Sequence, residues 1–407
     1  MTKFAFGLFC ACFVVLLYVY VLYPLAVRTL AKRIGVPVRR GNALPSVTIV
    51  VTAYNEERCI RSKLDNLSGL SYPPELVDII VASDGSSDAT EQIASSYRQA
   101  RVRVLRLEGR CGKTACQNAA AAVATGEILV FTDATTRLRS DALRYLVEQF
   151  ADPSVGCVGG SLRYVTEVDN VAGREGETYW SYELRLRAAE SMLGSLIGVS
   201  GCLYAVRRSA YRAIHPALIS DFVVAMKMRE QGLRTVLAPE AVCFESTLGI
   251  ARQELSMRVR VAIRTFNALI RERRFLNPFE YGWFAWQLWS HKVLRYASPI
   301  LWLGALAANV VLAQDALRLV SHESLAKWAS AVTAGGVLAW SALYLALLIA
   351  QMSLLLAGAV GFILQDRQLK PGVFGKPYYF LLTNLASLIA TLRYLQGERM
   401  VVWNPIR

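Results

Sequence analysis

The stretch Val47-Thr-Ile-Val-Val-Thr-Ala53, followed at once by Tyr54-Asn55-Glu56, decides the fold class. Seven uncharged residues rich in β-branched side chains are typical of a strand buried on both faces. Similar runs recur at 77–83, 102–107 and 127–133, with helix-like segments between them. This alternation predicts an α/β domain with a mostly parallel sheet.

Polar residues follow each of these four runs. Tyr54 and Glu56 come after the first run and Asp84 after the second, Lys113 lies beyond the third, and Asp133 ends the fourth. Any one of them alone could belong to a plain turn or cap a helix. Ligands of parallel sheets bind beyond the carboxyl ends of the strands, so four successive clusters predict a ligand site there.

Several other site types do not fit. Gly109 and Gly112, which precede Lys113, are separated by two residues where a P-loop has four. The first strand is not followed by GxGxxG, and no GxSxG occurs, which argues against a dinucleotide dehydrogenase and an α/β-hydrolase. The eight cysteines form no CxxC pair, and the three histidines are far apart, so a zinc site is not expected. Reduced thiols are expected, because six of the cysteines fall in the predicted cytosolic domain.

The composition indicates a membrane protein. Of 407 residues, 54% are apolar and only 19% are charged. Uncharged stretches at 4–27, 296–314 and 328–365 are each long enough to span a bilayer. The middle of 328–365 has no turn residue, so we expect one long span there, whereas the 16 residues 377–392 either span or lie flat. A cleaved signal peptide is the alternative for 4–27, but its apolar region would be about 7–15 residues long.

The charge pattern predicts the orientation. The net charge is +14, and one lysine precedes the first span whereas five basic residues follow it: Arg28, Lys32, Arg33, Arg39 and Arg40. The positive-inside rule therefore places the following domain in the cytosol and the neutral loop 315–327 outside, in a multi-pass protein of the inner membrane. The basic excess is assigned to membrane flanks and phosphate contacts rather than to nucleic acid. The expected divisions are 1–27 (first span), 28–250 (catalytic domain), 251–295 (interfacial helices) and 296–407 (C-terminal membrane region).

Further motifs follow the strand-end clusters. They are Tyr179-Trp-Ser-Tyr-Glu183 with Glu190-Ser191, Gly201-Cys-Leu-Tyr-Ala-Val-Arg207, Ser220-Asp221-Phe222 and Pro239-Glu-Ala-Val-Cys-Phe-Glu245. Together these motifs resemble the family 2 glycosyltransferases, the inverting nucleotide-sugar enzymes with a Rossmann-like GT-A fold. The resemblance is closer still to their membrane-embedded branch, which includes hyaluronan, chitin and cellulose synthases.

The resemblance implies roles for the matching residues. Tyr54 and Glu56 would meet the nucleotide base, Asp84 would hold the nucleoside, and Lys113 would lie beside it. Asp133 would meet the ribose, the diphosphate or a metal ion, Mg²⁺ or Mn²⁺. Asp221 would be the catalytic base that takes the acceptor proton. Arg258 and Arg260, with Arg264, would meet the diphosphate or lipid headgroups, a solvated basic face being the alternative.

Two departures from the family pattern limit the functional prediction. Thr135 stands where the second carboxylate of the DxD motif is usual, which weakens the metal site. Met257-Arg258-Val-Arg260-Val261 replaces QxxRW, which weakens processivity. We expect an inverting enzyme that moves a sugar, expected to be UDP-linked, to a polysaccharide or glycolipid at the cytosolic face. The alternatives are single transfer to a lipid-linked acceptor, or a non-catalytic nucleotide-sugar-binding subunit, against which Asp221 argues.

Overall fold

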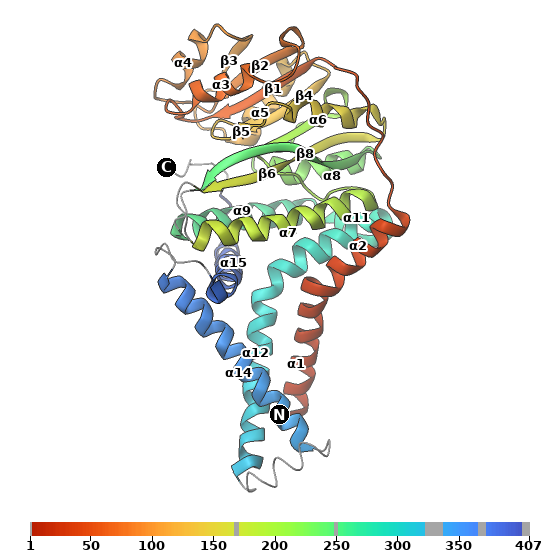
Figure 1. Ribbon diagram of the computed structural model, residues 1–407, viewed down its shortest axis with the longest axis vertical. Coiled ribbons are helices and arrows are strands. Elements are labelled where there is room, and N and C mark those ends of the chain that lie inside the picture. The colour runs from red at the N-terminus through yellow and green to blue at the C-terminus, as the bar shows by residue number, and fades with distance from the viewer. Residues whose placement is uncertain (1, 167–170, 248–250, 322–336, 365–371, 401–407) are drawn as a thin grey trace.

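An eight-stranded sheet organises the upper part of the protein, whose computed structural model describes residues 2–166, 171–247, 251–321, 337–364 and 372–400 (Figure 1). The strand order is β3-β2-β1-β4-β7-β6-β8-β5. The bounds are Val47–Ala53 (β1), Val77–Ser83 (β2), Val102–Arg106 (β3), Ile128–Asp133 (β4), Arg137–Leu138 (β5), Val155–Thr166 (β6), Leu203–Arg207 (β7) and Arg234–Thr247 (β8). Strands β1 to β4 are parallel, β7 runs antiparallel to β4 and β6, and β8 is parallel to β6. The predicted α/β domain with a mostly parallel sheet is therefore confirmed.

Both faces of the sheet are covered, which explains the uncharged strand sequences. Ile49 and Val51 of β1 pack into one core, whereas Val50 between them packs into the other. The first core includes α3 (Ile60–Ser68), α4 (Thr90–Ser96) and α6 (Ala142–Glu148). The second core includes α5 (Lys113–Val123) and α8 (Ser220–Glu230), so the helices that begin with Lys113 and near Asp221 lie on one face.

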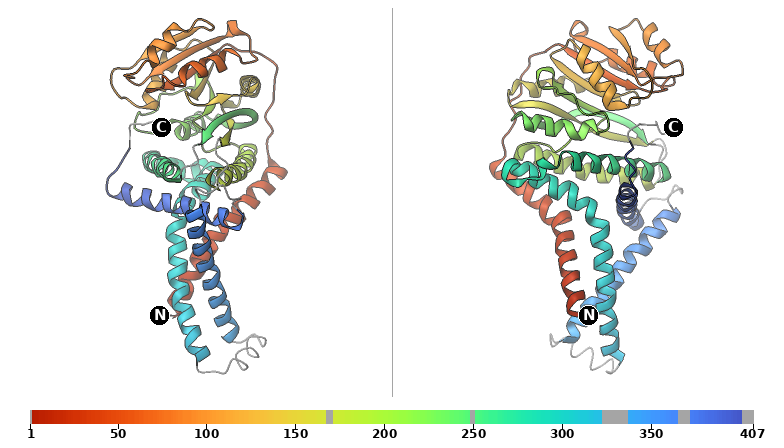
Figure 2. Two further views of the ribbon diagram at one scale, coloured as in Figure 1. Left: turned by 60° about the vertical axis from the view of Figure 1, so that its left-hand side comes forward. Right: turned by 180° about the vertical axis from the view of Figure 1, so that it is seen from behind.

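Helices connect this domain to a long stalk. Figure 1 shows α7 (Val171–Leu193) and α9 (Ala251–Arg271) lying beneath the β6–β8 end of the sheet. Below them run α1 (Thr2–Leu17), α12 (Leu294–Ser321) and α14 (Val337–Leu364), side by side in all three views (Figures 1 and 2). The left view of Figure 2 shows α15 (Gly372–Leu395) lying across the long axis, under α9.

Among the residues that the structure describes, three helical segments are long and apolar enough to cross a membrane: Thr2–Ile34, Trp283–Gln314 and Ala342–Leu364. They correspond to the three predicted spans, although the part of the third at 328–336 lies outside the described residues. The first helix does not end at Val27 but continues to Ile34. It does so through a π-helical turn at Tyr18–Leu22, and Pro24 then sits in the first turn of α2 (Tyr23–Ile34), where its missing N–H is tolerated.

A second π-helical turn, Leu288–Val293, lies against the first one. It follows the short helices α10 (Pro278–Tyr281) and α11 (Trp283–Gln287) and leads into α12. The Tyr18 hydroxyl lies 2.7 Å from Ser290 Oγ and accepts a hydrogen bond from Trp286 Nε1 at 2.8 Å. Such turns widen a helix locally and are frequent at functional sites. Here they bring polar groups of two spans into contact.

A buried ionic network joins α7 to these two spans. His291 Nδ1 lies 2.7 Å from Glu190 Oε1, and His291 Nε2 lies 2.9 Å from Glu183 Oε1. Tyr23 donates its hydroxyl to Glu190, and Arg295 donates to Glu183 at 2.9 Å. The imidazole therefore lies between two buried carboxylates. The two glutamates come from the Tyr179–Glu183 and Glu190-Ser191 motifs. These motifs therefore connect α7, which packs on the sheet domain, to the two helical segments that could span a membrane.

Removing His291 should destabilise this buried ionic network. His291→Ala leaves two buried carboxylates facing each other, and removing one partner of a buried ion pair costs about 3–5 kcal/mol. We expect a clear fall in the thermal unfolding temperature of the purified protein in detergent. His215→Ala is the matched control, because His215 is exposed and surface substitutions usually change stability by less than about 0.5 kcal/mol. Equal melting temperatures for the two variants would contradict a structural role for the network.

Candidate active site

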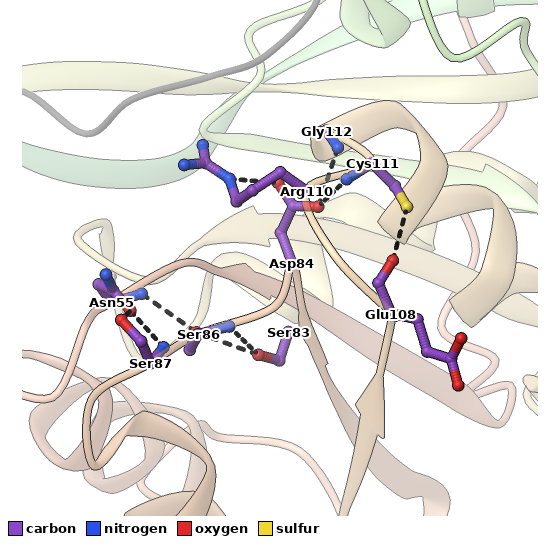
Figure 3. A network of polar contacts seen from close by, with 9 residues as sticks. All are labelled: Asn55, Ser83, Asp84, Ser86, Ser87, Glu108, Arg110, Cys111 and Gly112. Carbon is purple, nitrogen blue, oxygen red and sulfur yellow. Dashed lines mark hydrogen bonds and ion pairs between the residues drawn. The ribbon is translucent and has the colours of Figure 1, made fainter.

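The loops after β1 and β2 are tied to each other by short polar contacts (Figure 3). Asn55 has a positive φ of 53°, a conformation that asparagine tolerates. Its side-chain oxygen accepts from the Ser87 N–H at 2.7 Å, and its own N–H donates to Ser86 Oγ at 3.1 Å. Glu56, buried beside them, donates its N–H to Thr90 Oγ1 at 2.7 Å. The ends of the two strands therefore form one fixed edge.

Asp84 organises the loop that follows β3. Its Oδ1 accepts from the backbone N–H groups of Cys111 at 2.7 Å and Gly112 at 2.9 Å (Figure 3). Its Oδ2 lies 3.4 Å from Arg110 Nε, and the Arg110 guanidinium lies over the Tyr54 ring, 3.4 Å from its centroid. The residues assigned to the nucleoside by resemblance are thus in one place, with the carboxylate of Asp84 holding the loop.

Lys113 joins the first turn of α5 to the end of β4. Its ammonium forms an ion pair with Asp133 Oδ1 and donates to the Gly201 carbonyl at 3.2 Å. Burial disfavours the charged lysine, but Asp133 and Asp221 more than offset this, so the pKa of Lys113 is raised. A charged, partly buried Lys113 therefore lies close to two carboxylates.

Asp221 faces the same spot from the first turn of α8. A Cβ added at Gly201 would lie 2.8 Å from Asp221 Oδ2 and 3.2 Å from Lys113 Nζ, so glycine lets both charged groups lie close to the backbone at this position. In the described part of the chain, the buried Oδ1 of Asp221 has no hydrogen-bond partner. Burial raises the pKa of Asp221, while Lys113 and Arg264 act to lower it. A buried carboxylate with an unused oxygen and a raised pKa suits a general base.

More charged groups complete the cluster. Glu245, at the end of β8, accepts from Cys202 Sγ at 3.3 Å, and burial together with Asp133 raises its pKa. Arg264 is 8% exposed, donates to the Leu218 carbonyl at 3.2 Å and is electrostatically coupled to Asp221. Burial and the neighbouring Arg264 lower the pKa of Arg260, which Asp133 attracts. The cluster thus holds three carboxylates and three cations.

The remaining predicted residues lie at the edge of this cluster. Arg258 pairs with Glu254, 2.7 Å away on the same helix, and its guanidinium lies over the Tyr379 ring of α15. Thr135 is exposed. The sequence predicted no role for Glu245 or Gly201. It predicted a role for Arg264 only together with Arg258 and Arg260. The four-residue spacing of Arg260 and Arg264 could have placed both on one inward helix face, whereas the role of Gly201 depends on a long-range contact.

Residues 48–214 match the family model described as glycosyl transferase family 2. They form a glycosyl transferase family 2 domain. The resemblance predicted from the motifs is therefore confirmed for this segment, which contains every strand-end cluster of the site. Asp221, Glu245 and the α9 residues Arg258, Arg260 and Arg264 come after the matched residues.

Known proteins extend the comparison beyond the family 2 domain. The chain is 25% identical over 267 residues to poly-β-1,6-N-acetyl-D-glucosamine synthase of Staphylococcus aureus, covering 62% of this chain and 64% of that one. The Staphylococcus epidermidis protein of the same name is 25% identical over 236 residues, covering 56% of each chain. The chain thus spans less than two thirds of the length of these relatives.

A solved structure is similar over nearly the whole chain. It is the mannosyltransferase PcManGT from Pyrobaculum calidifontis in complex with GDP-Man and Mn²⁺. The TM-score is 0.65 at 24% identity, and the match covers 98% of this chain and 99% of that one. The predicted GT-A fold is therefore confirmed, together with helices that could span a membrane.

The charges around Asp221 predict a pH effect. A general base acts when ionised, so the rate of transfer should fall as the pH drops through the raised pKa of Asp221. Arg264→Leu removes a cation that lowers this pKa and should move the acidic limb of the kcat profile to higher pH. Arg252→Leu is the control, because Arg252 is an exposed arginine of the same helix. A shift to lower pH, or the same shift in both variants, would contradict the assignment.

Proposed function

We propose that this protein is an inverting glycosyltransferase that moves a sugar from a UDP-sugar to a polysaccharide or glycolipid acceptor at the cytosolic membrane face. The observation that carries the proposal is the Asp221 carboxylate, whose buried Oδ1 has no hydrogen-bond partner among the described residues, held with Lys113 close to Gly201. The family 2 domain and the polysaccharide synthases to which the chain is similar support it. UDP is proposed rather than another nucleotide because the motifs resemble the UDP-sugar-dependent polysaccharide synthases.

The reaction is one displacement. The acceptor oxygen bonds to the anomeric carbon as the bond from that carbon to the β-phosphate oxygen breaks, which inverts the configuration. Asp221 takes the acceptor proton, and the nucleoside diphosphate leaves with the bonding electron pair. Lys113, Arg260 and Arg264, which are coupled to the charges of Asp133 or Asp221, are the cations proposed to stabilise the charge that develops on the diphosphate. Tyr54, Glu56 and Asp84 bind or frame the nucleoside at the ends of β1 and β2.

A divalent cation fits this site only in part. Among the residues that the structure describes, no group of three His, Cys, Asp or Glu side chains is placed to hold a metal ion. Asp133 is the carboxylate available, and Lys113 already pairs with it. Mg²⁺ often takes one or two protein carboxylates and completes its shell with phosphate oxygens and water. Asp133 would therefore hold an ion that arrives with the nucleotide, and the ion would neutralise charge on the diphosphate.

Single transfer to a lipid-linked acceptor is the second candidate. It is favoured by the missing Gln and Trp around Arg258, which instead pairs with Glu254 and Tyr379. Purified protein in lipid nanodiscs should be incubated with labelled UDP- and GDP-sugars, and the products should be sized. Long products support polymer synthesis, and addition of one sugar supports the second candidate. A wild-type protein that transfers no sugar at all would overturn both and favour a binding subunit.

Metal removal should abolish transfer. We expect full loss of activity in EDTA, recovery with Mg²⁺ or Mn²⁺, and measurable metal binding by calorimetry only when UDP is present. Asp133→Ala should raise the metal concentration that half-restores activity, while Thr135→Asp should leave it unchanged or lower it. Asp141→Ala, at an exposed ion pair with Arg139, is the control. Undiminished activity in excess EDTA would mean that the basic side chains alone neutralise the diphosphate.

The orientation can be tested with cysteine probes. In a variant without native cysteines, a cysteine at Ser71, in the exposed turn before β2, should be shielded from an impermeant thiol reagent in intact cells. A cysteine at Ser321, the last residue of α12, should react because the positive-inside rule places that end outside. Reaction at position 71 with protection at 321 would reverse the proposed orientation.

A further inference from the structure

Lys63 is a buried lysine to which nothing above gives a role. It lies in α3 and is 3% exposed, directly beneath the turn that carries Asp133. Its ammonium donates to Thr132 Oγ1 at 2.9 Å and to the Thr136 carbonyl. The two acceptors flank Asp133 in sequence. Lys63 therefore binds both sides of the turn 132–136, from the face opposite the ligand site.

The contact continues beyond the turn. The Thr132 hydroxyl donates in turn to the Cys202 carbonyl at 2.9 Å. Cys202 follows Gly201, whose carbonyl accepts from Lys113 and whose backbone lies close to the Asp221 carboxylate. A chain of ammonium, hydroxyl and carbonyl therefore links α3 to the two segments that frame the cluster, the end of β4 and the turn before β7.

Burying the Lys63 ammonium costs free energy, and an apolar side chain could fill the same space without that cost. Burying a lysine is unfavourable, and burial lowers the pKa of Lys63 to about 7, although Asp133, Cys243 and Cys202 oppose the shift. A methionine would occupy similar volume without a buried charge. Ionic groups in such places can fix one arrangement of the chain at some expense of stability.

We propose that Lys63 is a positioning residue, which acts through the Thr132 hydroxyl to hold Asp133 and Gly201 at the spacing that transfer requires. The inference rests on the proposed function. Lys63 does not touch the substrate; instead it sets where Asp133 stands relative to Lys113 and Asp221. A misplacement of about 1 Å in such a site can cost on the order of 100-fold in rate.

The test compares substitutions at Thr132. Lys63→Met leaves two buried acceptors, Thr132 Oγ1 and the Thr136 carbonyl, without their donor, so this variant is more at risk of misfolding. Thr132→Val keeps the shape of the side chain and removes the bridging hydroxyl, whereas Thr132→Ser keeps the hydroxyl. Thr48→Val is the matched control. Thr48 is also a buried strand threonine, and it accepts the Gly126 N–H at 2.9 Å at the far end of β1.

We expect Thr132→Val to lower kcat by about 10- to 100-fold while the dissociation constant for UDP stays within a few-fold. Thr132→Ser should restore kcat to within a few-fold of wild type, and Thr48→Val should lower the melting temperature without lowering kcat. Lys63→Met, where it folds, should match Thr132→Val in kcat. Wild-type transfer with Thr132→Val as active as Thr48→Val would overturn this inference alone. Absence of transfer by the wild-type protein would instead overturn the proposed function, and this inference with it.

Discussion

The arrangement of the site depends on the partly buried ammonium of Lys113. A buried cation is stable only where it has anionic or carbonyl partners, and the partners of Lys113 come from three separate elements. Asp133 ends β4, Gly201 precedes β7, and Asp221 begins α8. Satisfying one charge therefore forces two strands and a helix to converge at the edge of the sheet where the nucleotide loops lie. The pKa of Asp221 is raised as well, because burial and the neighbouring Asp133 carboxylate both favour its protonated form.

A second buried network relates the membrane helices to this site. Glu183 and Glu190 of α7 hold His291 between them, and through Tyr23 and Arg295 they bind both adjoining spans. Lys292, next to His291, lies with its ammonium 5.7 Å from the centroid of the Phe222 ring, and Phe222 adjoins Asp221. The second span thus packs directly on the helix that carries the candidate base. Under the proposed function, this contact would hold Asp221 at a fixed distance from the helices that could span the membrane.

The features predicted correctly from the sequence are those that a local residue pattern specifies. The four runs rich in β-branched residues became β1 to β4, because strands buried on both faces leave a clear signal, and the polar residues after them meet at one edge. The bend at Tyr18–Leu22, which carries the first helix on to Ile34, could not be predicted because it depends on packing against the turn at Leu288–Val293. Lys63 went unnoticed for the same reason, since its partners lie about 70 residues away in sequence. Contacts of this range follow from the assembled sheet rather than from any short motif.

The central claim is that Lys113 and Asp221 work as one unit in sugar transfer. A double-mutant cycle on kcat/KM tests it most directly, with Lys113→Met, Asp221→Asn and the double variant compared with the wild-type protein. Residues that act as a unit show strongly non-additive losses. The account predicts that the double variant is about as slow as the slower single variant. Losses that multiply, as expected for two independent residues, would contradict it.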